Sequence, residues 1–349
     1  MGIKSEQDIK SAKENSLKSL NALYQQIAST SDCVVPLYDA IEDYFFQDID
    51  YQRVKSHVPL WMRNAGRSPE SRVDRAFYEQ LRSVYNDPVS NRIIHWFDVQ
   101  GLLAAFKDRV MAVGNYMEKI YAHLPAYCLY EDSEYGSASC GYDDTSDKVH
   151  TAINNVFVSL CSSFDLFTKV VYECSKYDIN CFTEYKKLKC RKDSVLYKKV
   201  NYEFEELKAN GLLYSEPRCV RIACSFRDEY IHNGSWDYRC AIYYPFVADG
   251  VAAEPFVLMP DVDDKGHLVT SGSRNKFYTK GDKVNVFLPG FVKDVMELLN
   301  NTIETLVDLL KKKTATGNRD KATNEVINML QNYVSFLPNI KNNDVAEAI

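Results

Sequence analysis

A wide apolar stripe between Val149 and Cys174 constrains the fold of this chain more than any other feature. Apolar residues recur there at the spacing of an α-helix, about 3.6 residues per turn. The stripe consists of Val149, Ile153, Val156, Phe157, Leu160, Phe164, Phe167, Val171 and Cys174. A stripe this wide has to be covered by other helices, and Ser146 or Asp147 is the predicted N-terminal cap. We therefore predict a core helix of a helical bundle.

The rest of the second half of the chain predicts further helices. A helix at 217–233 follows Pro217 and is closed by Asn233-Gly234, residues that are typical of helix boundaries. Another follows Pro289-Gly290 and carries Lys311–Lys313 at its C-terminal end, where cations favour the helix dipole. Weaker patterns predict helices at 194–209 and 321–336.

Four segments of the second half predict strands, because β-branched and aromatic residues alternate there with Gly, Pro and Asp turns. They are residues 238–246, 254–259, 266–271 and 277–288. The expected fold class is therefore mainly α: a four-helix core with a small antiparallel β insertion at about 238–288, and an N-terminal helical region.

The first half of the chain predicts helices at 8–28 and 68–85, short helical or irregular pieces within 35–62, and a long helix at 89–123. Residues 128–147 are rich in Gly, Ser and acidic residues, so we predict a linker loop. The expected domains are an N-terminal helical region of unknown role (1–127), the acidic linker (128–147), a helical domain with the β insertion (148–313), and a C-terminal helix and tail (314–349).

The composition is that of a folded protein, with 46% hydrophobic and 26% charged residues. No apolar run approaches the roughly 18 residues of a membrane span, and the N-terminal MGIKSEQDIK lacks the apolar core of a secretory signal. We expect a cytoplasmic protein without a membrane partner, whose ten cysteines stay reduced. The net charge of −6 argues against non-specific coating of nucleic acid but leaves room for a local basic groove.

The residues best suited to chemistry lie at the end of the predicted helix 217–233. The sequence lacks GxSxG, Walker, HExxH and GxGxxG motifs, and five of its six histidines have no companions that form a catalytic or metal pattern. His232 differs, because Asp228 precedes it by four residues and Arg227 by five. A carboxylate one turn away orients an imidazole for general acid–base work, and an arginine binds phosphate. We expect neither a metal nor another cofactor.

The spacing of Arg227 and His232 poses a geometric problem. Residues five apart on a helix differ by about 140° in direction, so the two side chains do not share a face. Either the helix breaks between them, or a second copy of the chain completes the site across a two-fold axis. The second alternative predicts a homodimer.

At Arg227, Asp228 and His232 the sequence resembles the HEPN superfamily of all-α bundles, whose motif is Arg, four to six residues, then His. The resemblance covers roughly residues 148–313. It implies a metal-independent endoribonuclease, in which the 2′-hydroxyl of RNA attacks the adjacent phosphate and leaves a 2′,3′-cyclic phosphate end. It also implies a toxin or antiviral defence effector with a regulatory or antitoxin partner.

A basic segment at 186–199 is the predicted RNA-binding surface, because seven positive charges there stand against one negative charge. Its candidate residues are Lys186, Lys187, Lys189, Arg191, Lys192, Lys198, Lys199 and Tyr197, with Tyr185 as a second stacking ring. A solvated basic loop is the alternative interpretation. For the whole chain, the alternatives to a ribonuclease are a non-catalytic HEPN-like module for RNA binding or dimerisation, and an unrelated helical interaction protein.

Overall fold

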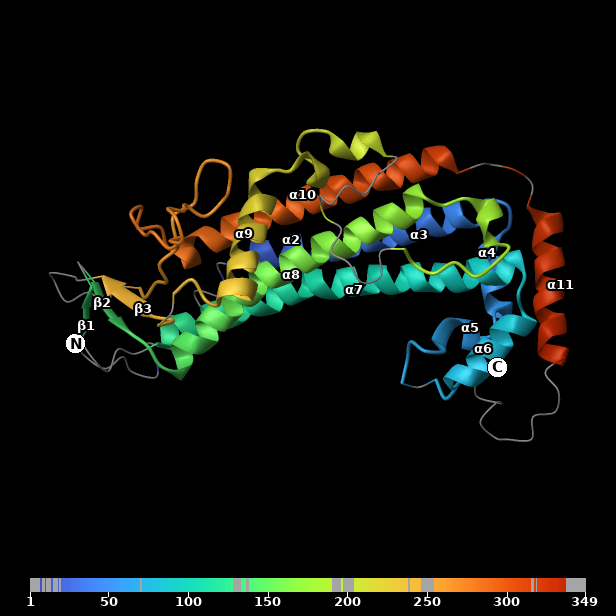
Figure 1. Ribbon diagram of the computed structural model, residues 1–349, viewed down its shortest axis with the longest axis horizontal. Helices are drawn as coiled ribbons and strands as arrows, with labels where there is room; N and C mark the ends of the chain where they lie inside the picture. The colour runs from blue at the N-terminus through green and yellow to red at the C-terminus, as the bar shows by residue number, and fades with distance from the viewer. Residues whose placement is uncertain are drawn as a thin grey trace. The chain divides into compact units, whose positions relative to one another are not determined.

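The computed structural model describes residues 20–69, 71–127, 133–135, 138–189, 204–237, 239–245, 254–314 and 319–336, together with a few single positions. Helices dominate these residues, and a small antiparallel sheet accompanies them (Figure 1). The predicted mainly α fold class is confirmed.

The helices of the described residues keep the order of the chain. They are α2 (Asn21–Asp32), α3 (Val34–Phe45), α4 (Tyr51–Val54), α5 (Leu60–Asn64), α6 (Arg75–Val84), α7 (Pro88–His123), α8 (Asp144–Ser175), α9 (Arg218–Asn233), α10 (Val284–Lys313) and α11 (Asp320–Phe336). The strands are β1 (Ser133–Tyr135), β2 (Ala138–Gly141) and β3 (Ile242–Pro245). Short 3-10 turns lie at Lys55–His57, Leu124–Ala126, Ile179–Phe182, Glu205–Lys208 and Leu213–Ser215.

The chain divides into two compact units, each assembled from three separate segments. Unit 1 comprises Met1–Cys33, Ala105–Asp165 and Glu205–Ile303, and unit 2 comprises Val34–Ala104, Leu166–Phe204 and Glu304–Ile349. This division differs from the expected succession of domains at 1–127, 128–147, 148–313 and 314–349. Helices α7, α8 and α10 each contribute residues to both units, which periodicity along the chain does not reveal.

Unit 1 is a bundle of α2, α9 and the parts of α7, α8 and α10 that belong to it. Phe157 on α8 stacks on Phe226 of α9 with ring centroids 4.6 Å apart, and lies 5.8 Å from Phe291 of α10. Helix α2 packs close to α7, because a Cβ added at Gly114 would lie 3.6 Å from Ile27. The apolar stripe of α8 is buried as predicted.

Unit 2 is held by aromatic packing and by polar contacts of α11. Phe45 of α3 lies 5.7 Å from the ring of Trp96 on α7. The backbone N–H of Asp50 donates to Oγ1 of Thr323 on α11 at 2.8 Å, and Arg53 pairs with Asp320 at 3.2 Å. The pieces predicted within 35–62 are helical and correspond to α3, α4 and α5, and α4 with its cap Asp50 contacts the last helix.

The sheet corrects two predictions. Its order is β1-β2-β3, with antiparallel pairs such as Ser133↔Cys140 and Cys140↔Tyr243. Two of its strands therefore lie within 128–147, where the sequence predicts a linker loop. The predicted strands at 254–259 and 266–271 are reduced to isolated bridges, such as Tyr243↔Phe256 and Val262↔Leu268. Extended backbone pairs only locally in this irregular segment.

The predicted strand at 277–288 is wrong from Val284 onward, because α10 begins there and contains Pro289. Proline has no N–H, so the carbonyl of Asn285, four residues earlier, loses its helical partner. The hydroxyl of Tyr121 on α7 donates to this carbonyl. The side chain of Asn285 also accepts from the N–H of Val257 at 3.2 Å. Tertiary contacts therefore compensate for Pro289, after which the sequence alone predicts that the helix begins.

The start of α8 also differs from the prediction. Asp143, rather than Ser146 or Asp147, is the cap: its carboxylate accepts from the N–H groups of Thr145 and Ser146 at 2.7 and 2.9 Å. The Ser146 hydroxyl accepts in turn from the N–H of Asp143 at 2.8 Å. This reciprocal pair is a capping box, with the cap three residues earlier than Ser146.

The other predicted helices have mixed outcomes. The helices at 217–233, 89–123 and 321–336 are confirmed as α9, α7 and α11, and Gly101 and Gly114 do not interrupt α7. The helix predicted at 68–85 begins later, at Arg75, where Asp74 caps it by accepting from the N–H of Phe77. Most of the helix predicted at 194–209 and the first part of the one at 8–28 lie outside the described residues.

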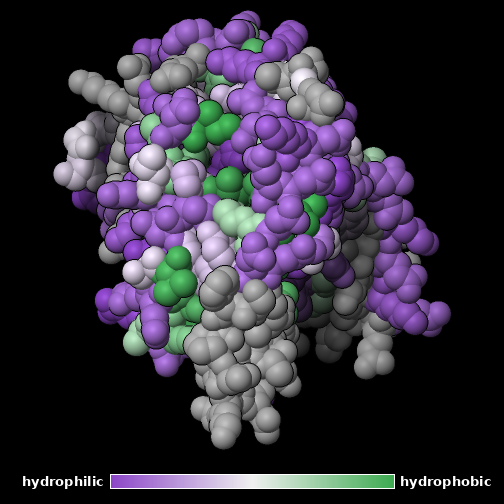
Figure 2. Space-filling view, turned by 90° about the vertical axis from the view of Figure 1, so that its right-hand side faces the viewer, coloured by the Kyte–Doolittle hydropathy of each residue, from purple (hydrophilic) through white to green (hydrophobic). Residues whose placement is uncertain are grey.

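Hydrophilic residues cover most of the face shown in Figure 2, and hydrophobic residues form small separate patches on it. The exposed large apolar side chains are scattered along the sequence: Val35, Leu60, Val84, Met111, Tyr142, Ile231 and Val286. Across the described residues, every helix is too short or too polar to cross a lipid bilayer.

Candidate functional site

Helix α9 carries all three residues of the predicted motif. It follows Pro217 and ends at Gly234, whose φ of 81° is a conformation that glycine adopts readily at a helix end. The helix runs without interruption from Arg218 to Asn233. It therefore does not break between Arg227 and His232, and the first of the two alternatives for bringing these side chains together is excluded.

Three residues form the outer side of α9: Asp228, Ile231 and His232. They are spaced as i, i+3 and i+4, which places them on one face of a helix. All three are exposed, and Ile231 leaves 54% of its surface accessible despite being apolar. Within the part of the chain that the structure describes, no hydrogen bond or ion pair joins His232 to Asp228. The expected contact between carboxylate and imidazole is therefore not made in the single chain.

Arg227 is half-buried, with 28% of its side chain exposed, and its guanidinium pairs with the carboxylate of Asp228 at 3.1 Å. The Nε of Arg227 is buried and has no hydrogen-bond partner in the described residues. The neighbouring carboxylate thus orients the guanidinium rather than the imidazole. The exposed part of the guanidinium, rather than the buried Nε, is what an anion could reach.

The inner side of α9 consists of its buried residues: Val220, Ile222, Ala223, Phe226 and Glu229. Glu229 is buried, and only 3% of its side chain is exposed. Its carboxylate pairs with Lys276 at 3.3 Å, accepts from the side-chain amide of Asn233 at 2.9 Å, and accepts from that of Asn275. The motif search did not single out Glu229, although the i, i+4, i+7 spacing from Ile222 is a signal that it faces inward.

Two thiols lie beside Arg227, and the motif search missed these as well. Cys161 of α8 is buried, and its thiol donates to the Cys224 sulfur of α9 across 3.9 Å. Burial raises the pKa of the Cys161 thiol well above its ordinary value. The hydrogen bond from Cys161 lowers the pKa of the Cys224 thiol, with burial acting against this and the charge of Arg227 reinforcing it. Only the fold brings the two cysteines together, since 63 positions separate them.

The predicted RNA-binding segment is only partly described. Arg191, Lys192, Tyr197, Lys198 and Lys199 lie outside the described residues. Lys187 and Lys189 are exposed, whereas Lys186 is half-buried and extends its ammonium over the ring of Phe182 at 5.5 Å. These three lysines belong to unit 2, whereas the motif on α9 belongs to unit 1. Steering of RNA by the segment stays a prediction.

The second proposed stacking ring, Tyr185, has partners within its own unit. Its hydroxyl donates to the carboxylate of Asp98 at 2.8 Å, and the guanidinium of Arg82 lies 4.7 Å from the ring centroid. A base would have to displace Arg82 to stack on that face of the ring.

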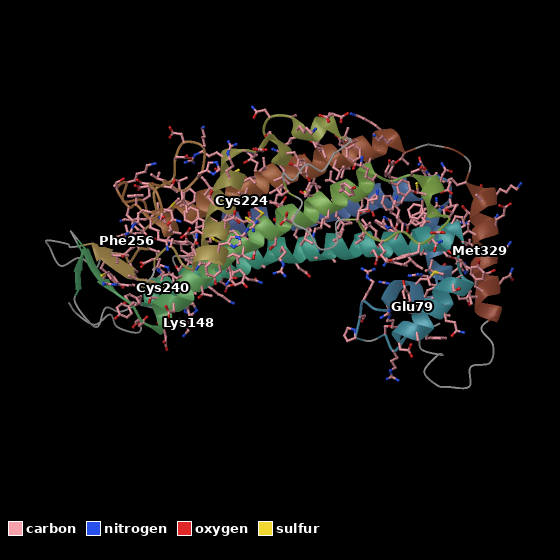
Figure 3. All side chains as sticks on the ribbon, in the orientation of Figure 1. Glu79, Lys148, Cys224, Cys240, Phe256 and Met329 are labelled. Carbon is pink, nitrogen blue, oxygen red and sulfur yellow. The ribbon has the colours of Figure 1, made fainter. Side chains whose placement is uncertain are left out.

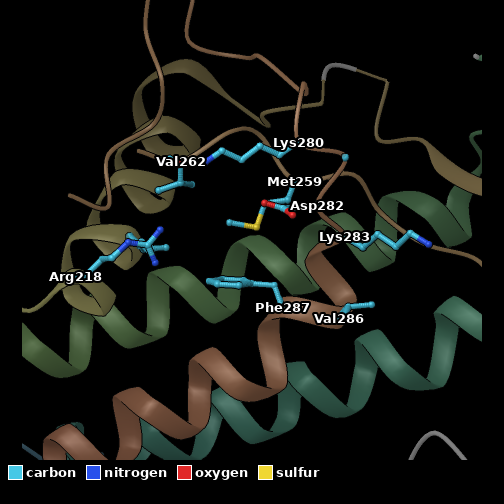
Figure 4. Close-up of a pocket in the computed structure, with 10 residues that line it drawn as sticks. Arg218, Met259, Val262, Lys280, Asp282, Lys283, Val286 and Phe287 are labelled. Atoms are coloured by element: carbon cyan, nitrogen blue, oxygen red, sulfur yellow. Dashed lines mark hydrogen bonds between the residues drawn. The ribbon is translucent and has the colours of Figure 1, made fainter. Parts of the chain in front are cut away.

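A pocket of about 450 Å³ lies near the N-terminal end of α9 and does not include the motif. Figure 4 shows Phe287 and Met259 in the pocket, with the cationic side chains of Arg218, Lys280 and Lys283 around it. Arg218 and Lys280 donate to the backbone carbonyls of Asp263 and Val262 at 3.3 and 2.6 Å. Arg218 therefore fastens the irregular segment 254–283 to α9, and Lys280 joins two parts of that segment to each other, so both cations have a structural explanation.

The described residues contain no group of three or more His, Cys, Asp or Glu side chains arranged to hold a metal ion. No protein-family model, curated protein or solved structure matches the chain.

Proposed function

We propose that the chain is a metal-independent endoribonuclease of the HEPN type, whose active site is completed by two copies of α9. The observation that carries the proposal is the outer side of α9. Asp228 and His232 are exposed beside a half-buried Arg227, part of whose guanidinium remains accessible. Substitution of exposed polar side chains usually changes stability little, so the fold does not depend on Asp228 and His232.

The proposed reaction is a transesterification within RNA. His232 removes the proton from the 2′-hydroxyl, whose oxygen attacks the adjacent phosphorus, and the 5′-oxygen of the next nucleotide leaves. A protonated imidazole supplies the proton to that oxygen; in a dimer it is the second copy of His232. Arg227 donates to the non-bridging oxygens as charge develops on them, and Asp228 keeps the guanidinium oriented. The products are a 2′,3′-cyclic phosphate and a free 5′-hydroxyl.

A two-fold pairing of α9 supports this arrangement. On an uninterrupted helix Arg227 and His232 point about 140° apart, so one chain does not direct both at the same phosphate. A second, antiparallel copy of the outer side would bring its own His232 toward the first copy's Arg227. Ile231 lies between the two polar residues of the outer side, and its exposed side chain offers an apolar contact at the centre of such an interface.

The test compares RNA cleavage by the wild-type chain with that by His232→Ala and Arg227→Ala, in the presence of EDTA. The chain offers matched controls. His267 is another exposed histidine of unit 1, and Arg221 lies on α9 itself, with 34% of its side chain exposed and a carboxylate partner, Glu216, at 3.8 Å. We expect each motif variant to lose about 100-fold or more in rate. His267→Ala and Arg221→Ala should stay close to wild type.

The identity of the RNA ends separates this chemistry from its alternatives. Three results together support the proposal. Cyclic phosphate ends form in EDTA, the cleavage rate changes between roughly pH 5 and 8, and both motif variants fail to produce these ends. Folded motif variants that cleave like the wild type would overturn it. A wild-type chain that dimerises or binds RNA without cutting it would be a non-catalytic module instead. A role as a toxin or defence effector with a regulatory partner follows from the resemblance alone.

A further inference from the structure

The paired thiols of Cys161 and Cys224 have the geometry of a reversible disulfide. Their sulfurs are 3.9 Å apart, and a disulfide needs about 2.05 Å. The remaining gap is less than the arc through which a sulfur moves when its side chain rotates, and two side chains share the movement. The same two helices also pack through the rings of Phe157 and Phe226, which stack with centroids 4.6 Å apart.

The two thiols differ in the way that a reacting and a resolving cysteine differ. Cys224 is only partly buried, whereas Cys161 is 3% exposed and lies behind it. The thiol hydrogen bond from Cys161 and the charge of Arg227 both favour the thiolate of Cys224, although Asp228 and Asp165 oppose it. A thiolate that is partly accessible reacts with peroxides, and a buried neutral thiol does not.

We propose that Cys224 and Cys161 form a redox modification site, in which a hydroperoxide oxidises Cys224 and Cys161 then closes a disulfide between α8 and α9. The proposal does not require the ribonuclease activity, since it rests on the two thiols and their surroundings, although Arg227 borders both sites. Figure 3 marks Cys224 on α9, and Arg227 follows it by three residues.

The reaction balances in two steps. The Cys224 thiolate attacks one peroxide oxygen, the O–O bond breaks, and a sulfenic acid forms while the other oxygen leaves as hydroxide or alkoxide. The Cys161 sulfur then attacks the Cys224 sulfur, the S–O bond breaks, and the Cys161 proton leaves with that oxygen as water. The two thiols lose two electrons in total, and the peroxide gains them. A dithiol reductant reverses the change.

The first measurement needs no variant. The folded wild-type chain is treated with hydrogen peroxide, its remaining thiols are alkylated, and its peptides are mapped by mass spectrometry with and without reduction. We expect a cross-linked pair of peptides, one with Cys161 and one with Cys224, whose mass is that of the two reduced peptides minus two hydrogen atoms. Both thiols should be recovered after reduction. Oxidation of other cysteines while Cys161 and Cys224 stay reduced would overturn the proposal.

Variants assign the order of events. In Cys161→Ser, Cys224 should accumulate as a sulfenic acid that a dimedone-type probe traps. In Cys224→Ser, Cys161 should stay reduced. Cys219 is the matched control, because it lies on the same helix, is also partly buried, and has a pKa raised by burial. We expect Cys224 to react about tenfold faster than Cys219, or more. Equal rates for the two, or a disulfide that survives Cys224→Ser through Cys161 and another cysteine, would contradict the assignment.

Discussion

The inner and outer sides of α9 carry neighbouring residues of one short motif, yet the inner residues are buried and the outer ones are exposed. Glu229 on the inner side is buried and has three polar partners, Lys276, Asn233 and Asn275. His232 on the outer side is exposed and has no such partner in the described residues. The inner side therefore has a clear structural purpose, whereas the outer side adds little to folding.

The segment after α9 continues the inner side. Trp236 is buried, and its ring centroid lies 5.2 Å from that of Phe226 and 6.2 Å from that of His150 on α8. Charge and polarity alone therefore do not identify a functional residue. Surroundings distinguish Glu229, which the fold uses, from Asp228 and His232, which remain available to a substrate or a partner.

The largest expected effect is on the inner side. Glu229→Ala leaves Lys276 and two amide groups without their acceptor, so the free energy of unfolding should fall by about 3 kcal/mol. Asp228→Ala removes only a partly solvated ion pair, and its change should stay within about 1 kcal/mol. Urea unfolding at neutral pH measures both values. Equal losses of unfolding free energy in the two variants would show that the inner and outer sides of α9 contribute equally to stability.

A second effect concerns pH. His150 is buried, its Nε2 donates to the carbonyl of Ala241 at 3.0 Å, and burial lowers its pKa below the ordinary 6.5 despite the opposing charges of Asp237 and Asp147. As pH falls below 6.5, the His150 imidazole binds a proton in the unfolded chain but stays neutral in the folded chain, so the free energy of unfolding decreases. This contribution is fully present above pH 6.5.

The measurement for His150 is the slope of unfolding free energy against pH. His150→Gln should flatten the slope between pH 6.5 and lower values, relative to the wild type. An unchanged slope in His150→Gln would show that His150 does not cause the loss of stability at low pH.

Much of the helical fold could be predicted from the sequence, because long apolar stripes such as that of α8 depend on local periodicity. The errors arose where distant contacts decide local structure. Pro289 lies inside α10 because Tyr121 donates to the carbonyl that proline leaves unpaired. Strand β2 forms in an acidic segment because β3, about a hundred residues later, pairs with it, and β1 then pairs with the other edge of β2.

The candidate site divides in the same way. The motif identified Arg227, Asp228 and His232. Their spacing indicated that Arg227 and His232 point in different directions if the helix is uninterrupted, and the helix is uninterrupted. Sequence reasoning let Asp228 position the imidazole, the guanidinium or both, and it also allowed an ordinary helix end in which Arg227 pairs with Asp228 or Glu229; the structure pairs Asp228 with the guanidinium of Arg227. The thiol pair of Cys161 and Cys224 was beyond sequence reasoning, since it depends on how α8 packs on α9.

A third test concerns the exposed apolar residue of the outer side. If Ile231 lies at the centre of a two-fold interface, Ile231→Asp buries a charge against its own copy and should weaken dimerisation at least tenfold. Val286→Asp is a matched control, because Val286 is another strongly exposed apolar residue of unit 1. Sedimentation equilibrium measures both dissociation constants. Similar constants for both variants would remove Ile231 from any interface.

The smallest expected effect is the stability change of His232→Asn, and this variant tests most directly whether the outer side of α9 contributes to catalysis without contributing to folding. His232 is exposed and makes no hydrogen bond or ion pair in the described residues, so the free energy of unfolding should change by no more than about 0.5 kcal/mol. The same substitution should nevertheless abolish RNA cleavage, because asparagine does not transfer protons as an imidazole does. Urea unfolding and cleavage assays on one preparation decide the matter. If stability and cleavage fall together, His232 is a structural cap of α9, and its exposed position has no catalytic meaning.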